Sequence, residues 1–186
     1  MSNVATNVST GKPNKSGAIY YGPLTTTPPT STEDALTGFT HVGYISEDGL
    51  TNDNAPSSEQ VKAWGGDTVL NLQTERPDSF SFTMLETLNA DVLKLVYGDS
   101  NVDVSTAEAT KGDITVKSTA QELDAHVFVI DMIVRGGKKK RIVIPNGTVS
   151  SLETINYKDN EATGYAVTIT DVPDSNGVYH YEYIKA

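Results

Sequence analysis

The chain has 186 residues, of which 37% are hydrophobic and 20% are charged, a size and composition typical of one folded domain. It carries 24 acidic and 14 basic residues, and its formal net charge of -10 opposes binding to nucleic acid or anionic membranes, because both require a cationic surface. The absence of cysteine excludes disulfides, thiolate nucleophiles and cysteine-based zinc sites.

No segment has the pattern of a membrane helix or a secretory signal. The longest apolar stretch, residues 127–134, is interrupted by Asp131, whereas a membrane helix needs about 18–20 apolar residues. Residues 1–11 are polar and lack both a basic start and an apolar run. We therefore expect cytoplasmic synthesis without export or membrane insertion.

The first part of the chain predicts an extended N-terminal arm over residues 1–38, followed by a single domain over residues 39–186. The arm is rich in Ser, Thr, Asn and Pro, above all in residues 25–32, and proline lacks the donor that a sheet ladder needs. One apolar patch, Ala18-Ile19-Tyr20-Tyr21, interrupts it. This patch could dock on the same subunit or on a neighbouring one.

Strand patterns recur from residue 39 to the end of the chain. They cover residues 39–45, 68–73, 79–85, 114–117, 125–134, 140–144, 165–170 and 178–184. Short, frequent strands are typical of a mainly β fold, and we expect a β-sandwich or barrel of two packed sheets. Residues 125–134 have apolar side chains on both faces, so a helix of the same chain or a neighbouring subunit must cover the second face.

One short helix is predicted over residues 90–97, flanking the sheets. Leu88, Val92, Leu95 and Val96 recur at helical spacing, and the segment is bounded by Asn89, a good N-cap, and by Gly98.

Four dipeptides with turn-forming residues predict hairpins: Gly65-Gly66, Gly136-Gly137, Asn146-Gly147 and Asn176-Gly177. The polar residues 46–60 show no periodicity and predict a long inter-subunit loop, since loops of this length usually carry a function.

The sequence gives no catalytic, cofactor-binding or metal site, and we expect no enzyme and no cofactor. The three histidines, His41, His126 and His180, are far apart and lack the spacing of a metal motif. There is no Gly-x-Ser-x-Gly nucleophile motif and no phosphate-binding loop. Asp99 and Asp103 resemble the start of a calcium loop whose later ligands are missing, which leaves at most an opportunistic calcium ion in the acidic loops.

The strongest charge run, Arg135 with Lys138, Lys139, Lys140 and Arg141, flanks the Gly136-Gly137 turn. It could be a solvated hairpin tip, a nucleic-acid patch, or a basic knob that docks on the acidic surface of the next copy. A nucleic-acid patch would add interleaved aromatic residues, which are missing. Residues 1–38, 39–134 and 135–186 carry two bases and two acids, five and sixteen, and seven and six, for nets of 0, -11 and +1. This asymmetry favours head-to-tail docking.

Three stretches resemble the major tail tube proteins of long-tailed, non-contractile (siphovirus-type) bacteriophages: residues 43–51 (GYISEDGLT), 62–69 (KAWGGDTV) and 89–98 (NADVLKLVYG). The resemblance covers about residues 17–98 well, and the remainder by its strand-rich character. It implies a β-sandwich or barrel with a flanking helix. It also implies rings of six copies that stack around a tape-measure protein and form a conduit for DNA.

By the same resemblance, the partners are further copies of this chain, a tape-measure protein and tail-tip or terminator proteins, with DNA only as passing cargo and no membrane. The location is the virion tail, made and assembled in the bacterial host cytoplasm. Residues 46–60 would reach another subunit, while the arm and the last strand would help to link rings.

The candidate subunit-interface residues are Ser46, Glu47, Asp48, Gly49, Leu50, Arg135, Lys138, Lys139, Lys140, Arg141, Ile19, Tyr20 and Tyr21. The alternative function is a monomeric β-sandwich that binds carbohydrate or a receptor on a phage or cell surface. In that case Tyr179, Tyr181 and Tyr183, which share one face of a predicted strand, could form a sugar platform, although a core face also fits them.

Overall fold

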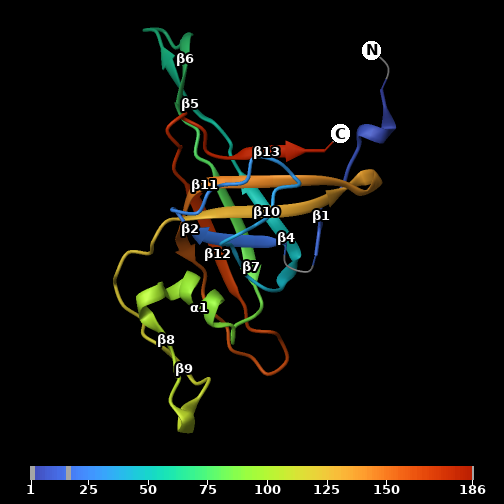
Figure 1. The fold of residues 1–186 in the computed structure, drawn as a ribbon. Coiled ribbons are helices and arrows are strands. Elements are labelled where there is room, and N and C mark those ends of the chain that lie inside the picture. Colours follow the sequence, from blue (N-terminus) through green and yellow to red (C-terminus); the bar gives the residue numbers. More distant parts are fainter. Residues whose placement is uncertain (1–2, 16–17, 186) are drawn as a thin grey trace.

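The computed structural model describes residues 3–15 and 18–185, and the fold is mainly β with one short α-helix (Figure 1). The remaining positions of the predicted arm and domain, residues 1, 2, 16, 17 and 186, lie outside the described residues. The strands are β1 (Lys12–Pro13), β2 (Ile19–Pro23), β3 (Thr40–His41), β4 (Ile45–Asp53), β5 (Ser57–Lys62), β6 (Thr68–Glu75), β7 (Ser79–Met84), β8 (Val102–Val104), β9 (Ile114–Val116), β10 (His126–Val134), β11 (Lys138–Leu152), β12 (Tyr165–Asp171) and β13 (Tyr181–Ile184). The helix α1 spans Ala90–Tyr97, and 3-10 turns lie at Ala5–Asn7, Asp99–Asn101, Glu108–Thr110 and Arg135–Gly137.

The long strand β11 joins two layers of an antiparallel sandwich. The strand order is β3-β2-β10-β11-β12-β7-β4, with β1 added to β10 and β13 added to β11. The first part of β11 pairs with β10 and β13, and its last part pairs with β12. In Figure 1, β10 and β11 cross over β12 and β7. The predicted two-layer β-sandwich is confirmed.

The path of β11 corrects one turn prediction. Asn146-Gly147 is not a hairpin turn but lies inside β11, where pairing changes from β10 to β12. A Cβ atom on Gly147 would lie 2.8 Å from Ile169 Cγ2 and 3.1 Å from Phe128 Cδ2. Glycine is therefore required for close packing of the two layers at this point.

The main core lies between the layers and under α1. Its fully buried side chains include Phe80 and Met84 from β7, Phe128 from β10 and Ile144 from β11. The alternation predicted for β7 is confirmed, because Phe80, Phe82 and Met84 are buried while the intervening residues are half-buried.

The helix forms where it is predicted. The Asn89 side chain accepts a hydrogen bond from the Asp91 amide at 3.0 Å, and Gly98 ends the helix with φ of 94°. Val92, Leu93, Leu95 and Val96 are buried in the main core, whereas Leu88 precedes the helix and is 88% exposed. Among the described residues, no helix is long and apolar enough to cross a membrane.

The second face of β10 is covered by the chain itself. Val127 and Val129 are buried with Val143 of β11 in a second, smaller core. Its cover consists of Leu36 and Phe39 from the N-terminal segment, Tyr20, and the stacked rings of Tyr181 and Tyr183. The expected burial of both faces holds for residues 127–130, while residues 131–134 are half-buried.

The polar residues 46–60 form strands instead of the predicted loop. Most of β4 pairs with β7 at one edge of the large sheet, and β5 pairs with β6 in a separate two-stranded hairpin. Every residue of β5 and β6 is exposed. Strand β6 agrees with the strand predicted over residues 68–73, whereas β4 and β5 lie where a loop was predicted, because their residues lack the alternation of apolar and polar types that indicates a strand.

Candidate assembly interface

The β5–β6 hairpin projects from the body of the subunit at one end (Figure 1). Within the part of the chain that the structure describes, its strands pair only with each other, and the connecting turn uses Gly65 and Gly66 at φ of 118° and 99°. Positive φ at both positions is the conformation that glycine adopts without steric cost. An isolated two-stranded hairpin is at best marginally stable in water, so this one needs a cover.

One face of the β5–β6 hairpin carries three apolar side chains beside Glu59, which is paired with Leu72. Val61 pairs with Leu70, and Leu72 lies on the same face two residues further along β6. These three side chains are 41%, 50% and 47% exposed, and Trp64 at the turn is 107% exposed. Sequence reasoning did not include them among the candidate interface residues. The Gly65-Gly66 turn and the strand at residues 68–73 were predicted from the sequence, but nothing in the pattern assigned their apolar side chains to an interface.

The predicted interface segment from Ser46 to Leu50 lies on the edge strand β4. It lines a groove of about 560 Å³, whose other wall is formed by β1 and by Ile130 and Met132 of β10. Glu47 and Asp48 are exposed there, whereas Leu50 packs against the main core. This groove thus has exposed acidic side chains, Glu47 and Asp48, beside the apolar side chains of Ile130 and Met132.

The predicted patch Ile19-Tyr20-Tyr21 forms most of β2 and packs within the subunit. Ile19 and Tyr21 are buried in the main core, and Tyr20 packs on the second core. The Tyr21 hydroxyl donates a hydrogen bond to the Asp91 carbonyl of α1 at 2.9 Å. Burial raises the pKa of Tyr21 above its ordinary value.

The cationic turn between β10 and β11 is largely paired with the chain's own groups. The Arg135 backbone amide donates to the Ser9 hydroxyl, and its guanidinium group donates to the Ala5 carbonyl. Lys139 pairs with Glu33 at 2.8 Å and Lys140 pairs with Glu182 at 2.6 Å. Within the described residues, Lys138 forms no ion pair and is exposed.

Arg141 holds the N-terminal segment against the sheet. Its guanidinium group binds both carboxylate oxygens of Asp131, at 2.6 and 2.8 Å, and is 5% exposed. It also donates to the carbonyls of Ser31 and Asp34, each at 2.9 Å. The Asp131 carboxylate raises the pKa of Arg141. Unlike Lys138, this predicted interface residue faces the interior of its own subunit.

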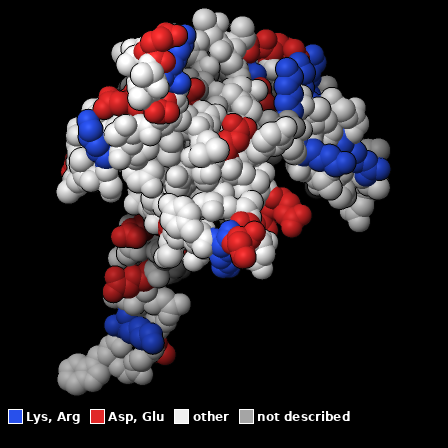
Figure 2. Space-filling view, turned by 90° about the horizontal axis from the view of Figure 1, so that it is seen from below, with Lys and Arg blue, Asp and Glu red and all other residues white. Residues whose placement is uncertain are grey.

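A groove of about 510 Å³, called here the basic groove, lies beside this turn. Its apolar floor and cationic rim come from Met132, Val134, Ile184, Arg135, Lys138, Lys140 and Lys185. Elsewhere the charges are mixed: Figure 2 shows acidic and basic side chains interspersed over one face of the molecule. The basic groove therefore combines apolar area with a local excess of positive charge.

A comparison with known proteins gives the family. The family model described as Phage tail tube protein matches residues 9–186, nearly the whole chain. The chain belongs to the phage tail tube protein family. No curated protein matches it. Membership confirms the resemblance to tail tube proteins. It makes the chain a structural protein of the virion tail that self-assembles into a tube and associates with other tail components.

The same tail tube fold brings Asp78, Asp171 and His180 together, although His180 and Asp78 are 102 positions apart. The sequence indicated no metal site, because spacing along the chain cannot show such a group. Burial, and then the neighbouring Asp78 charge, raise the pKa of Asp171 to about 8. These are the residues of the described chain that could hold a metal ion.

Proposed function

We propose that this tail tube protein closes head to tail into rings, six copies per ring as the resemblance implies, and that stacked rings form the conduit for DNA delivery. The observation that carries the proposal is the uncovered apolar face of the β5–β6 hairpin. A contiguous exposed apolar face marks an interaction site, and the chain belongs to a self-assembling family. The expected cover is a second copy of the chain.

The basic groove is the surface that fits the hairpin. Residues 57–75 contain the acids Glu59, Asp67 and Glu75 and the base Lys62, for a net charge of -2. The hairpin thus offers an apolar stripe with negative charge, and the groove offers an apolar floor with a positive rim. Complementary charge fixes register and excludes wrong partners more than it adds affinity.

The placement of the two surfaces supports a ring. In Figure 1 the β5–β6 hairpin projects at the top of the molecule and the β10–β11 turn lies at its right-hand side, so the two surfaces are separate. When two different surfaces of the same subunit meet, the contact is heterologous and repeats until a rotation closes it into a ring. Such a contact also allows open filaments if the rotation does not close, so ring number must be measured.

The remaining partners follow from the proposed tube. A tape-measure protein would occupy the lumen during assembly in the host cytoplasm, and tail-tip and terminator proteins would cap the ends. The net charge of -10 disfavours adhesion of DNA phosphates to the subunits, which suits a conduit through which DNA passes as cargo.

The test compares assembly of the native chain with that of a triple variant, Val61→Ser with Leu70→Ser and Leu72→Ser. Electron microscopy and sedimentation of concentrated protein should show rings or tubes for the native chain and single subunits for the variant. A matched control is Leu88→Ser with Leu152→Ser, two exposed leucines outside the hairpin, and it should assemble normally. Tubes built by the triple variant, or a native chain that stays monomeric at every concentration, would contradict the proposal.

A further inference from the structure

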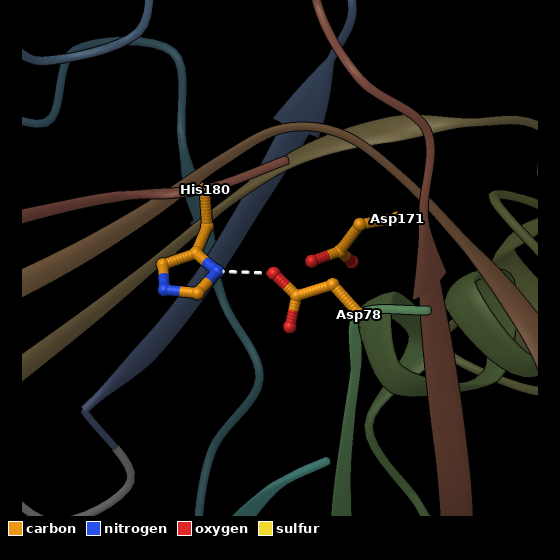
Figure 3. Close-up of side chains that lie close together, drawn as sticks. All are labelled: Asp78, Asp171 and His180. Atoms are coloured by element: carbon orange, nitrogen blue, oxygen red, sulfur yellow. Dashed lines mark hydrogen bonds and ion pairs between the residues drawn. The ribbon is translucent and has the colours of Figure 1, made fainter. Parts of the chain in front are cut away.

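Two buried carboxylates and a partly buried imidazole meet where β7, β12 and the segment before β13 come together (Figure 3). Asp78 directly precedes β7, Asp171 ends β12, and His180 directly precedes β13. One ligand atom from each side chain lies within 4.8 Å of the other two. Asp78 and Asp171 are 5% and 4% exposed, so water has little access to either carboxylate.

Two of the three side chains are held in place by neighbours. The Asn52 amide at the end of β4 donates to Asp78 Oδ1 at 2.7 Å, and the other Asp78 oxygen faces His180 Nδ1. The rings of His180 and Phe80 pack edge to face, with their centroids 5.3 Å apart. The imidazole nitrogen is thereby directed at the two carboxylates.

Asp171 is the unexplained member of the group. Among the described residues, neither of its carboxylate oxygens has a hydrogen-bond partner, and Figure 3 shows the carboxylate directed at the other two side chains. Its neighbour Asp78 is of like charge. A buried, unpaired carboxylate is costly, and native proteins generally supply a counter-charge or a donor at such a position.

We propose that Asp78, Asp171 and His180 bind a divalent transition-metal ion, for which Zn²⁺ is the representative. Two carboxylates neutralise the charge of the ion, and a neutral imidazole completes a mixed nitrogen and oxygen donor set. Calcium and magnesium prefer six or more oxygen ligands and fit this set poorly. Metal–ligand bonds of about 2.0–2.2 Å place tetrahedral donors about 3.4 Å apart, so the group closes around the ion by small side-chain movements.

The ion would fasten the base of the β5–β6 hairpin to the C-terminal segment. The chain enters the hairpin from β4, where Asn52 orients Asp78, and returns from it at Asp78 itself. Through His180 the ion would also be bound to the segment before β13, and through Asp171 to the end of β12. Asn52 acts as a positioning residue, because it holds the Asp78 carboxylate without being a ligand. Metal binding does not depend on the proposed ring contact and is measured on single subunits.

The test uses tag-free protein from which metals have been removed by a chelator and dialysis. Calorimetric titration with Zn²⁺ should show saturable binding of one ion per chain. In thermal unfolding, Zn²⁺ should raise Tm, while Ca²⁺ and Mg²⁺ at equal concentration should have little effect. Asp171→Asn, a substitution of the same shape, should weaken Zn²⁺ binding by about 100-fold or more, and Asn52→Ala by about 10- to 100-fold. The exposed Asp159→Asn is the matched control and should bind like the native chain.

X-ray absorption of the Zn²⁺-loaded native protein should show one imidazole together with oxygen ligands. His180→Gln serves as a second ligand variant, and circular dichroism checks that both ligand variants remain folded. The proposal is overturned if the native chain binds no Zn²⁺ saturably, or if folded Asp171→Asn and His180→Gln bind it as tightly as the native chain. It is also overturned if Tm responds to pH but not to Zn²⁺, because a proton alone would then satisfy Asp171.

Discussion

Two polar segments of this tail tube protein, residues 24–39 and the β5–β6 hairpin, differ in where their apolar side chains are covered. Residues 24–39, called here the docked arm, bury Leu36 and Phe39 on the second core, and Arg141 binds two of the arm's carbonyls. The hairpin also has apolar side chains, but none of the described residues of the subunit covers them. The surface that covers the arm's apolar side chains belongs to the same chain, and we infer that the surface that covers the hairpin belongs to the next copy.

The largest effect is expected from removing the group that anchors the docked arm. Arg141→Met should lower the free energy of unfolding by about 3 kcal/mol, because it leaves the Asp131 carboxylate, which is only 13% exposed, without its partner. Urea unfolding followed by circular dichroism measures this. Arg135→Met, at the exposed turn, is the matched control and should stay within about 0.5 kcal/mol of the native chain. Equal stabilities for the two variants would show that Arg141 does not anchor the arm.

An intermediate effect is expected from charge exchange between the proposed contact surfaces. Lys138→Glu should raise the protein concentration needed for half-assembly by about tenfold, roughly 1.4 kcal/mol per contact, while monomer stability is unchanged. Adding Glu59→Lys to the same chain should recover much of the loss, and high salt should reduce both effects. Light scattering against concentration measures assembly. A Lys138→Glu chain that assembles normally, or a double variant worse than the single one, would break the proposed pairing of the basic groove with the hairpin.

The smallest effect concerns the pH dependence of the docked arm. Hydrogen bonds from Lys139 and Lys185 lower the pKa of Glu33 to about 2, below its ordinary value of 4.5. The pairing therefore contributes stability above about pH 4.5, and this contribution is lost as pH falls towards 2. Glu33→Gln should lower the urea midpoint slightly at pH 7 and not at pH 2. A difference of the same size at both pH values would mean that the Glu33 charge is not involved.

The sequence predicted those parts of the fold whose signals are local. The helix at residues 90–97 was predicted with its correct ends because Asn89, an apolar stripe and Gly98 act over a few residues. Most strands of the sandwich were predicted because one face is buried and the other is wet. Strand β6 and the Gly65-Gly66 turn were predicted, but β5 was assigned to a loop, because all of its residues are exposed in the single subunit and show no alternation of buried and exposed positions.

The candidate interface was only partly predictable for a similar reason. Arg141 was grouped with the exposed cations of its charge run, yet a hairpin centred on Gly136-Gly137 places it directly opposite Asp131. The register of that hairpin was therefore a usable signal for a buried ion pair. Asp78, Asp171 and His180 gave no such signal, because they are brought together only by the packing of distant strands.

The most direct test of the account is hydrogen exchange of residues 57–75 in single subunits and in assembled tubes. We predict that the hairpin amides exchange rapidly in the single subunit, since no side chain of the hairpin is buried there, and at least tenfold more slowly in tubes. Amides of β10 next to the docked arm should be protected equally in both forms. Equally rapid exchange of the hairpin in tubes would contradict the claim that the next copy covers it.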